Sequence, residues 1–188
     1  MLPSELGCYS SHYSLWLQLV SDPTADKYIV LEDDTIVNWL FMERLVQASE
    51  AELGADLLRL YFTKMPPVRE LRRNFLAFGS YSIIELLDSG WGAVGYVLNK
   101  RAAERLVGAL QKVLRPVDIA MEAAWLHGLP NLAVFPFPVM EEGVPSSIPD
   151  ERYSVSSKPL GLKARRGVAR LLESIRKWCW RYRRILRP

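Results

Sequence analysis

Residues 27–34 read KYIVLEDD, an apolar and partly β-branched run that ends in three consecutive acids, Glu32, Asp33 and Asp34. Such a run predicts a short buried strand over 27–31. Open α/β sheets bind ligands at the carboxyl ends of their strands, so the three acids are expected at a ligand-binding edge. In an extended chain Glu32 and Asp34 project to one side, where they would form a hard oxygen site for Mn²⁺ or Mg²⁺. The alternative is that Asp33 or Asp34 only turns the chain towards the next helix.

Strands and helices alternate on both sides of this segment. Apolar residues at three- and four-residue spacing predict a helix over 5–20. The capping residues Asn38 and Asn99 predict helices over 38–53 and 99–114. Further strands are expected over 56–62, 75–84, 93–98 and 132–135, a short helix over 118–127, a surface loop with Arg69, Arg72 and Arg73, and a long loop over 136–157. This order predicts an α/β layered sheet flanked by helices.

Length and composition indicate one folded domain, expected over 1–157, with a tail over 158–188. No apolar run reaches the roughly 18–20 residues that a membrane span needs, and the N-terminus lacks the pattern of a signal peptide. Cys8 and Cys179 lie far apart in unlike contexts, so cysteine spacing indicates neither a disulfide framework nor a zinc site. The default expectation is a reducing, cytoplasmic setting.

The tail accounts for the net positive charge of the chain. Residues 158–188 contain eleven Lys and Arg against one acid, a net +10, whereas residues 1–157 hold 13 bases and 20 acids, a net −7. Residues 163–186 place an apolar stripe with Trp178 and Tyr182 opposite a basic face, which predicts a basic amphipathic helix on an anionic membrane surface. The alternative is a C-terminal helix docked on the domain with its charges in solvent. Nucleic acid is not an expected partner.

Four motifs occur in one order: GCYSSH at 7–12, LEDD at 31–34, GAVGYVLNKRAAERL at 92–106 and PVD at 116–118. Together they resemble glycosyltransferase family 25, the lipooligosaccharide-biosynthesis family that includes the collagen galactosyltransferases. The resemblance covers roughly residues 2–148. It implies a GT-A-like fold that binds a nucleotide sugar, a divalent metal, a UDP-sugar donor (often UDP-galactose) and inversion at the anomeric carbon.

The resemblance also implies site residues. It places Glu32 and Asp34 on the metal and diphosphate site. It implies donor contacts for Gly7, Ser11, His12, Glu32, Asp33 and Tyr96, with Gly92 and Gly95 on the same glycine–tyrosine strand. Ala93 departs from the family, which often has Thr there, and residues 146–148 loosely match a C-terminal Ser-Ile element. For His12 the alternative is a partly buried, hydrogen-bonded histidine without a catalytic role.

Inverting sugar transfer needs one carboxylate near the attacking hydroxyl group. Asp118 falls on the family's Pro-x-Asp position and is the expected catalytic base. Glu141 and Glu142 compete with it, and Asp118 could instead only cap the helix that follows Pro116.

The first strand of the family, with its Asn-Leu and Arg-rich motif, has no counterpart in this sequence, so we expect the sheet to lack its first strand or strands. The expected function is transfer of galactose from a UDP-sugar to a bacterial glycolipid or oligosaccharide acceptor of the lipopolysaccharide type, at the inner face of the inner membrane. The alternative is a non-catalytic remnant or a membrane-associated binding protein.

Overall fold

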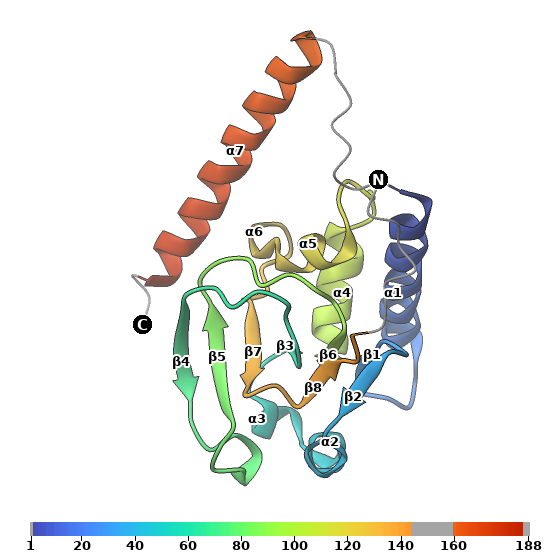
Figure 1. Ribbon diagram of the computed structural model, residues 1–188. Coiled ribbons are helices and arrows are strands. Elements are labelled where there is room, and N and C mark those ends of the chain that lie inside the picture. The colour runs from blue at the N-terminus through green and yellow to red at the C-terminus, as the bar shows by residue number, and fades with distance from the viewer. Residues whose placement is uncertain (1, 144–159, 186–188) are drawn as a thin grey trace.

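The computed structural model describes residues 2–143 and 160–185 of the 188-residue chain (Figure 1). The α-helices are α1 (Pro3–Ser21), α2 (Trp39–Gln47), α3 (Glu50–Leu53), α4 (Lys100–Ala109), α5 (Val117–Glu122), α6 (Ala124–His127) and α7 (Leu160–Ile185), with one 3-10 turn, η1 (Phe75–Ala77). The strands are β1 (Lys27–Leu31), β2 (Thr35–Val37), β3 (Leu57–Arg59), β4 (Val68–Arg72), β5 (Ser82–Leu86), β6 (Gly95–Asn99), β7 (Leu132–Phe135) and β8 (Val139–Glu141).

Six strands form one mixed sheet in the order β1-β6-β3-β7-β5-β4. Neighbouring strands are antiparallel, except that β3 and β7 run parallel. β2 and β8 form a separate antiparallel ribbon. Within the described residues, β1 and β4 are the edge strands of the larger sheet. The mixed sheet flanked by helices confirms the predicted α/β architecture.

Strand β6 divides the core into two layers. All five of its residues are buried, and successive side chains of a strand point to opposite faces. Tyr96 and Leu98 therefore pack with α1, α4 and α5, while Val97 packs with α2 on the other face. Gly95 has no room for a side chain, since a Cβ atom there would lie 3.2 Å from Leu31 Cδ2. The glycine lets β1 and β6 approach closely at the end of β1.

The predicted helix over 38–53 is two helices. Asn38 caps α2 by accepting a hydrogen bond from the Phe41 amide at 3.2 Å. A second cap interrupts the helix, because Ser49 and Glu52 form a reciprocal capping box that starts α3. Gly54 then ends α3 at a φ of +64°, which confirms the predicted stop.

Two predictions for the loops were wrong. The arginine-rich segment is strand β4, paired with β5, in which Arg69 donates to Glu85 Oε2 at 2.5 Å. The long loop expected from residue 136 contains β8, whose partner β2 lies about a hundred residues earlier in the chain. The helix expected over 99–114 also ends earlier, at Ala109.

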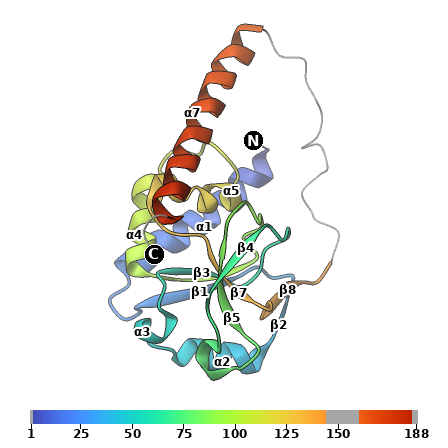
Figure 2. The ribbon, with the colours of Figure 1, turned by 90° about the vertical axis from the view of Figure 1, so that its left-hand side faces the viewer.

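Helix α7 contacts the rest of the domain near α6 (Figures 1 and 2). Among the described side chains, three ion pairs support this contact: Glu173 with Arg115, Lys177 with Asp88, and Arg184 with Glu85. A cavity of about 220 Å³ remains between α7 and the loop after β5. The opposite face leaves five apolar side chains exposed, namely Leu171, Leu172, Ile175, Trp178 and Tyr182. The helix is thus docked on the domain, as the alternative expected, but Lys177 and Arg184 face the domain while Arg176 and Arg183 stay exposed.

No helix in the described residues is long and apolar enough to cross a membrane.

Candidate functional site

The GCYSSH helix, the acidic strand end and the glycine–tyrosine strand meet at Tyr96. Its hydroxyl group lies 2.7 Å from His12 Nδ1 and accepts a hydrogen bond from Trp16 Nε1 at 3.0 Å. All three side chains are buried. Burial raises the pKa of Tyr96 far above its usual value, so the hydroxyl group stays protonated. Tyr96 therefore fixes α1 against β6 and is closed to solvent.

His12 connects this buried group to the acidic turn. Its Nε2 lies 3.9 Å from Glu32 Oε1, and Cys8 is a further polar neighbour beside Glu32 and Tyr96. Burial lowers the pKa of His12, whereas hydrogen bonds and charge interactions with Cys8 and Glu32 raise it, to about 9. The imidazole is thus positively charged at neutral pH and positions the Glu32 carboxylate. This agrees with the alternative that His12 is a buried, hydrogen-bonded histidine.

The acidic turn begins directly after β1. Glu32 still donates its amide to Val94 O at 2.9 Å, and Thr35 Oγ1 donates to Glu32 O at 2.9 Å. Residues 33 and 34 form a turn, so the alternation of an extended strand does not hold beyond Leu31. The reason given for Glu32 and Asp34 pointing to one side was therefore wrong, and their assignment to a metal stays a prediction.

Asp34 has a feature that fits a cation. Its Oδ1 is shielded from solvent, and no hydrogen-bond donor of the described residues reaches it. A buried carboxylate oxygen without a donor is costly unless a positive charge or a water molecule meets it. The donor set of the turn, carboxylate and carbonyl oxygens, is the chemistry that Mg²⁺ and Mn²⁺ prefer. The residues present are compatible with such an ion.

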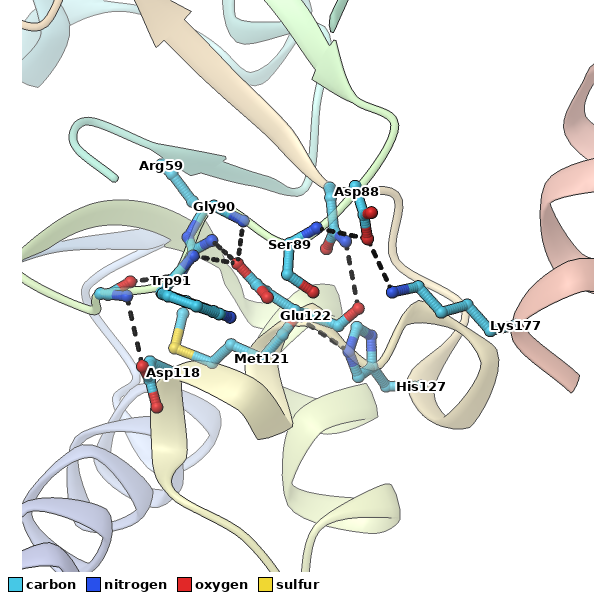
Figure 3. Close-up of polar contacts among 12 residues, drawn as sticks. Arg59, Asp88, Ser89, Gly90, Trp91, Asp118, Met121, Glu122, His127 and Lys177 are labelled. Carbon is cyan, nitrogen blue, oxygen red and sulfur yellow. Dashed lines mark hydrogen bonds and ion pairs between the residues drawn. The ribbon is translucent and has the colours of Figure 1, made fainter. Parts of the chain in front are cut away.

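Residues 90–94 form a wall segment beside the acidic turn, and Figure 3 shows the polar contacts of Gly90 and Trp91 within it. Trp91 adopts a φ of +56°, a conformation that is costly for a residue with a side chain and needs support from its surroundings, whereas Gly92 adopts its φ of +82° freely. Asp118 Oδ2 accepts a hydrogen bond from the Gly92 amide at 3.3 Å. The Glu32 backbone amide binds Val94 O and the Asp118 carboxylate binds the Gly92 amide, so both residues adjoin the same short segment.

A buried ion pair holds the start of this segment. Glu122 Oε1 accepts hydrogen bonds from the amides of Gly90 at 2.8 Å and Trp91 at 2.6 Å, and from Arg59 Nη1 at 2.6 Å. Arg59 also donates to Gly92 O. Sequence reasoning missed this pair. The available signal was an arginine inside the apolar strand DLLRLYF, since a buried arginine needs a carboxylate partner.

The remaining predicted residues lie at the surface of the site or outside the described part of the chain. Gly7 and Ser11 are exposed, and a Cβ atom on Gly7 would meet nothing within 4 Å, so close packing does not explain this glycine. Asp33 is exposed. Glu142, the competing base, donates its amide to Asp34 O at 2.8 Å and so lies beside the acidic turn, as does Glu141, which pairs with Thr35. Residues 146–148 fall outside the described residues.

Asp118 does not cap the helix through its side chain. The N-cap residue of α5 is Pro116, which makes no side-chain hydrogen bond, and the Asp118 carboxylate is directed at Gly92 instead. The alternative that the Asp118 side chain caps this helix was therefore wrong, although Asp118 does lie in the first turn of α5. The carboxylate is half-buried, which leaves part of it open to solvent.

Comparison with known proteins relates this chain to one family. Residues 1–121 match the sequence model of glycosyltransferase family 25 (LPS biosynthesis protein). Procollagen galactosyltransferase 2 of Homo sapiens is 29% identical over 120 residues, 61% of this chain and 18% of the relative. Procollagen galactosyltransferase 1 of Danio rerio is 32% identical over 123 residues, 61% of this chain and 19% of the relative. Inactive glycosyltransferase 25 family member 3 of Homo sapiens is 32% identical over 120 residues, with 61% and 19% covered.

The chain thus spans about a fifth of the length of each of these relatives. The matched residues 1–121 include the GCYSSH helix, the acidic turn, the glycine–tyrosine strand and Asp118. A family model that covers well over half of the chain, and every motif on which the resemblance rested, identifies the chain as a member of glycosyltransferase family 25.

Proposed function

We propose that this chain is a glycosyltransferase that transfers galactose from UDP-galactose to a glycan acceptor. The observation that carries the proposal is that the Glu32 backbone amide and the Asp118 carboxylate are both hydrogen-bonded to residues 92–94, in a family whose relatives include proteins named galactosyltransferases. The GT-A-like sheet of the proposal is compatible with the mixed sheet of the structure. A glycolipid or oligosaccharide of the lipopolysaccharide type is our proposed acceptor, as the family description suggests.

In this proposal the donor lies across the acidic turn, and its diphosphate faces Glu32 and Asp34. Mn²⁺ or Mg²⁺, held by these two carboxylates, would neutralise the diphosphate and stabilise the leaving UDP. His12 keeps Glu32 in place through its positive charge. The exposed residues Gly7, Ser11 and Asp33 are available at the rim for the donor.

The acceptor side is assigned to Asp118. An inverting transfer requires that a carboxylate removes the proton of the attacking hydroxyl group as the bond to the anomeric carbon forms. Asp118 is half-buried beside Gly92, and its second oxygen is not used in a hydrogen bond to the described backbone. Glu141 and Glu142, beside the acidic turn, remain the competing candidates.

Replacing Asp34 by Asn tests the metal site. We expect Asp34→Asn to abolish Mn²⁺-dependent binding of UDP-galactose and to leave the fold intact, because the substitution removes the charge but keeps the shape. Isothermal titration calorimetry with and without Mn²⁺ measures the effect. Asp26→Asn, at an exposed aspartate outside the turn, is the matched control and keeps full binding. Unchanged Mn²⁺-dependent binding by Asp34→Asn would remove this residue from the site.

A non-catalytic role is the second candidate, and one relative favours it, since a human protein of similar identity is named as inactive. A protein of this kind would keep donor binding without turnover. Release of UDP from UDP-galactose in the presence of a panel of glycan acceptors separates the two functions. Binding of the donor without any UDP release would support the non-catalytic candidate.

We further propose that α7 binds an anionic membrane surface, which would place the protein at the inner face of a membrane. The support is the orientation of the helix. Its charged face is engaged with the domain, while Trp178 (62% exposed), Tyr182 (50%) and their apolar neighbours face solvent. Arg176 and Arg183 flank this stripe and are exposed. An apolar stripe with flanking bases and aromatic residues suits the interface of a bilayer.

The membrane proposal predicts that Ile175→Asp releases the protein from vesicles that contain anionic lipid. The substitution puts a charge inside the apolar stripe and leaves the ion pairs to the domain in place. Ser174→Asp, at an exposed position outside the stripe, is the charge-matched control and retains binding. Vesicle co-sedimentation measures both variants. High salt should weaken binding of the unaltered chain without eliminating it, since screening acts on the charges only. Failure of the unaltered chain to bind ends the proposal.

A further inference from the structure

A cluster of unlike ligand atoms lies where α1 meets the end of β1. Cys8 Sγ, a ring nitrogen of His12 and a carboxylate oxygen of Glu32 all lie within 4.8 Å of one another. Among the described residues, this is the one group of three or more such side chains that are close enough to share an ion. Cys8 and Glu32 are half-buried and His12 is buried, so the cluster has one side towards solvent.

The geometry points to a second metal site in which Cys8, His12 and Glu32 bind a borderline divalent transition metal of the Zn²⁺ type. This inference goes beyond the proposed donor site, because two of its three ligands, Cys8 and His12, are not ligands of the proposed Mn²⁺ or Mg²⁺ site. Glu32 is common to both sites, and the thiolate and imidazole favour a different class of metal. Thiolate and imidazole ligands select zinc-like ions, whereas Mg²⁺ and Mn²⁺ prefer oxygen ligands. Spacing along the sequence gave no sign of it, because Glu32 is supplied from another element.

The helix supplies two of the ligands in a suitable arrangement. Cys8 and His12 are four residues apart on α1, and residues at this spacing lie on the same face of a helix. Tetrahedral zinc with bonds of about 2.0–2.3 Å requires ligand atoms roughly 3.3–3.8 Å apart. His12 Nε2 and Glu32 Oε1, at 3.9 Å, are already close to this separation. Small side-chain rotations would bring in the rest of the cluster.

The surroundings of His12 fit a metal ligand. A ligating histidine commonly uses its second ring nitrogen for a hydrogen bond to an oxygen, which fixes the orientation of the ring. His12 Nδ1 is engaged by Tyr96 Oη at 2.7 Å, which leaves Nε2 towards Glu32. The Tyr96 hydroxyl group is itself held by Trp16. The metal would displace the protons of Cys8 and His12 and leave one coordination position for water or another ligand.

Cobalt(II) provides a direct test, because a Co²⁺–thiolate bond gives a charge-transfer band in the near ultraviolet. We expect the unaltered, reduced chain to bind one Co²⁺ with this band, and Zn²⁺ to displace the cobalt. Cys8→Ser should lose the band and lower the affinity for Co²⁺ by at least about tenfold. This is the lower limit of the loss found when a residue that only hydrogen-bonds to a metal ligand is removed. Cys179→Ser removes the exposed cysteine of α7 and keeps the band.

Two further variants keep the test decisive. Glu32→Gln retains both α1 ligands, so it should keep the thiolate band with weaker Co²⁺ binding. Asp34→Asn removes the other predicted metal ligand of the acidic turn and should leave the cobalt spectrum unchanged, which separates this site from the proposed donor site. Circular dichroism checks that each variant is folded. Absence of the band in the unaltered chain, or its survival in Cys8→Ser, would overturn the inference.

Discussion

Replacing Asp118 by Asn is expected to lower the rate of sugar transfer by about two to four orders of magnitude, the usual contribution of a positioned base. Asparagine keeps a side-chain oxygen that can accept the hydrogen bond of the Gly92 amide, so the wall at residues 90–94 should keep its conformation. Binding of UDP-galactose should therefore change much less than turnover. Release of UDP, measured beside donor affinity by calorimetry, separates the two quantities.

The controls for Asp118 distinguish its chemical role from its structural role. Asp118→Ala removes both the base and the hydrogen-bond acceptor, so it should lower donor affinity as well as turnover. Glu142→Gln tests the competing carboxylate beside the acidic turn. A large loss of turnover in Glu142→Gln, together with near-normal turnover in Asp118→Asn, would move the base to the ribbon of β2 and β8.

Truncating Glu122 to Ala should lower the free energy of unfolding by about 3–5 kcal/mol. Breaking a buried ion pair has this cost because the remaining charge, here on Arg59, stays buried without a partner. The amides of Gly90 and Trp91 would lose their acceptor at the same time. Chemical denaturation measures the change.

A double variant isolates the contribution of the charge. Arg59→Met combined with Glu122→Leu replaces the pair by apolar side chains and should recover part of the loss, since such replacements are often tolerated. Recovery should stay incomplete because the two amides remain without an acceptor. Glu104→Ala, at an exposed position of α4, should change stability by no more than about 0.5 kcal/mol. A loss below about 1 kcal/mol for Glu122→Ala would contradict this account of the wall.

Local patterns predicted much of the fold. The bounds of β1 and β7 follow directly from their apolar runs, and the Asn38 cap lies where α2 begins. The break between α2 and α3 also had a local signal, because Ser49 and Glu52 have the spacing of a capping box. The β2–β8 ribbon had no such local signal, because the sequence of either strand is too short to indicate its distant partner.

The candidate site was also predicted only in part, because some of its contacts join residues that are distant in the sequence. Motif order placed His12, Glu32 and Tyr96 in one region, and the structure brings these three together. The alternation of side chains along an extended strand did not predict the direction of Asp34, because residues 33 and 34 form a turn after β1. Sequence reasoning could not find Glu122, since its importance comes from long-range contacts with Arg59 and the Gly90–Trp91 amides.

The position of β1 at the edge of the sheet has a consequence for association. β1 pairs with β6 along one side, and within the described residues no strand pairs with its other side. Backbone groups along such an edge can template an additional strand from another chain or from another part of the same protein. Any strand added there would lie directly beside the acidic turn at Glu32. Assembly by strand addition would therefore change the accessibility of the proposed donor site.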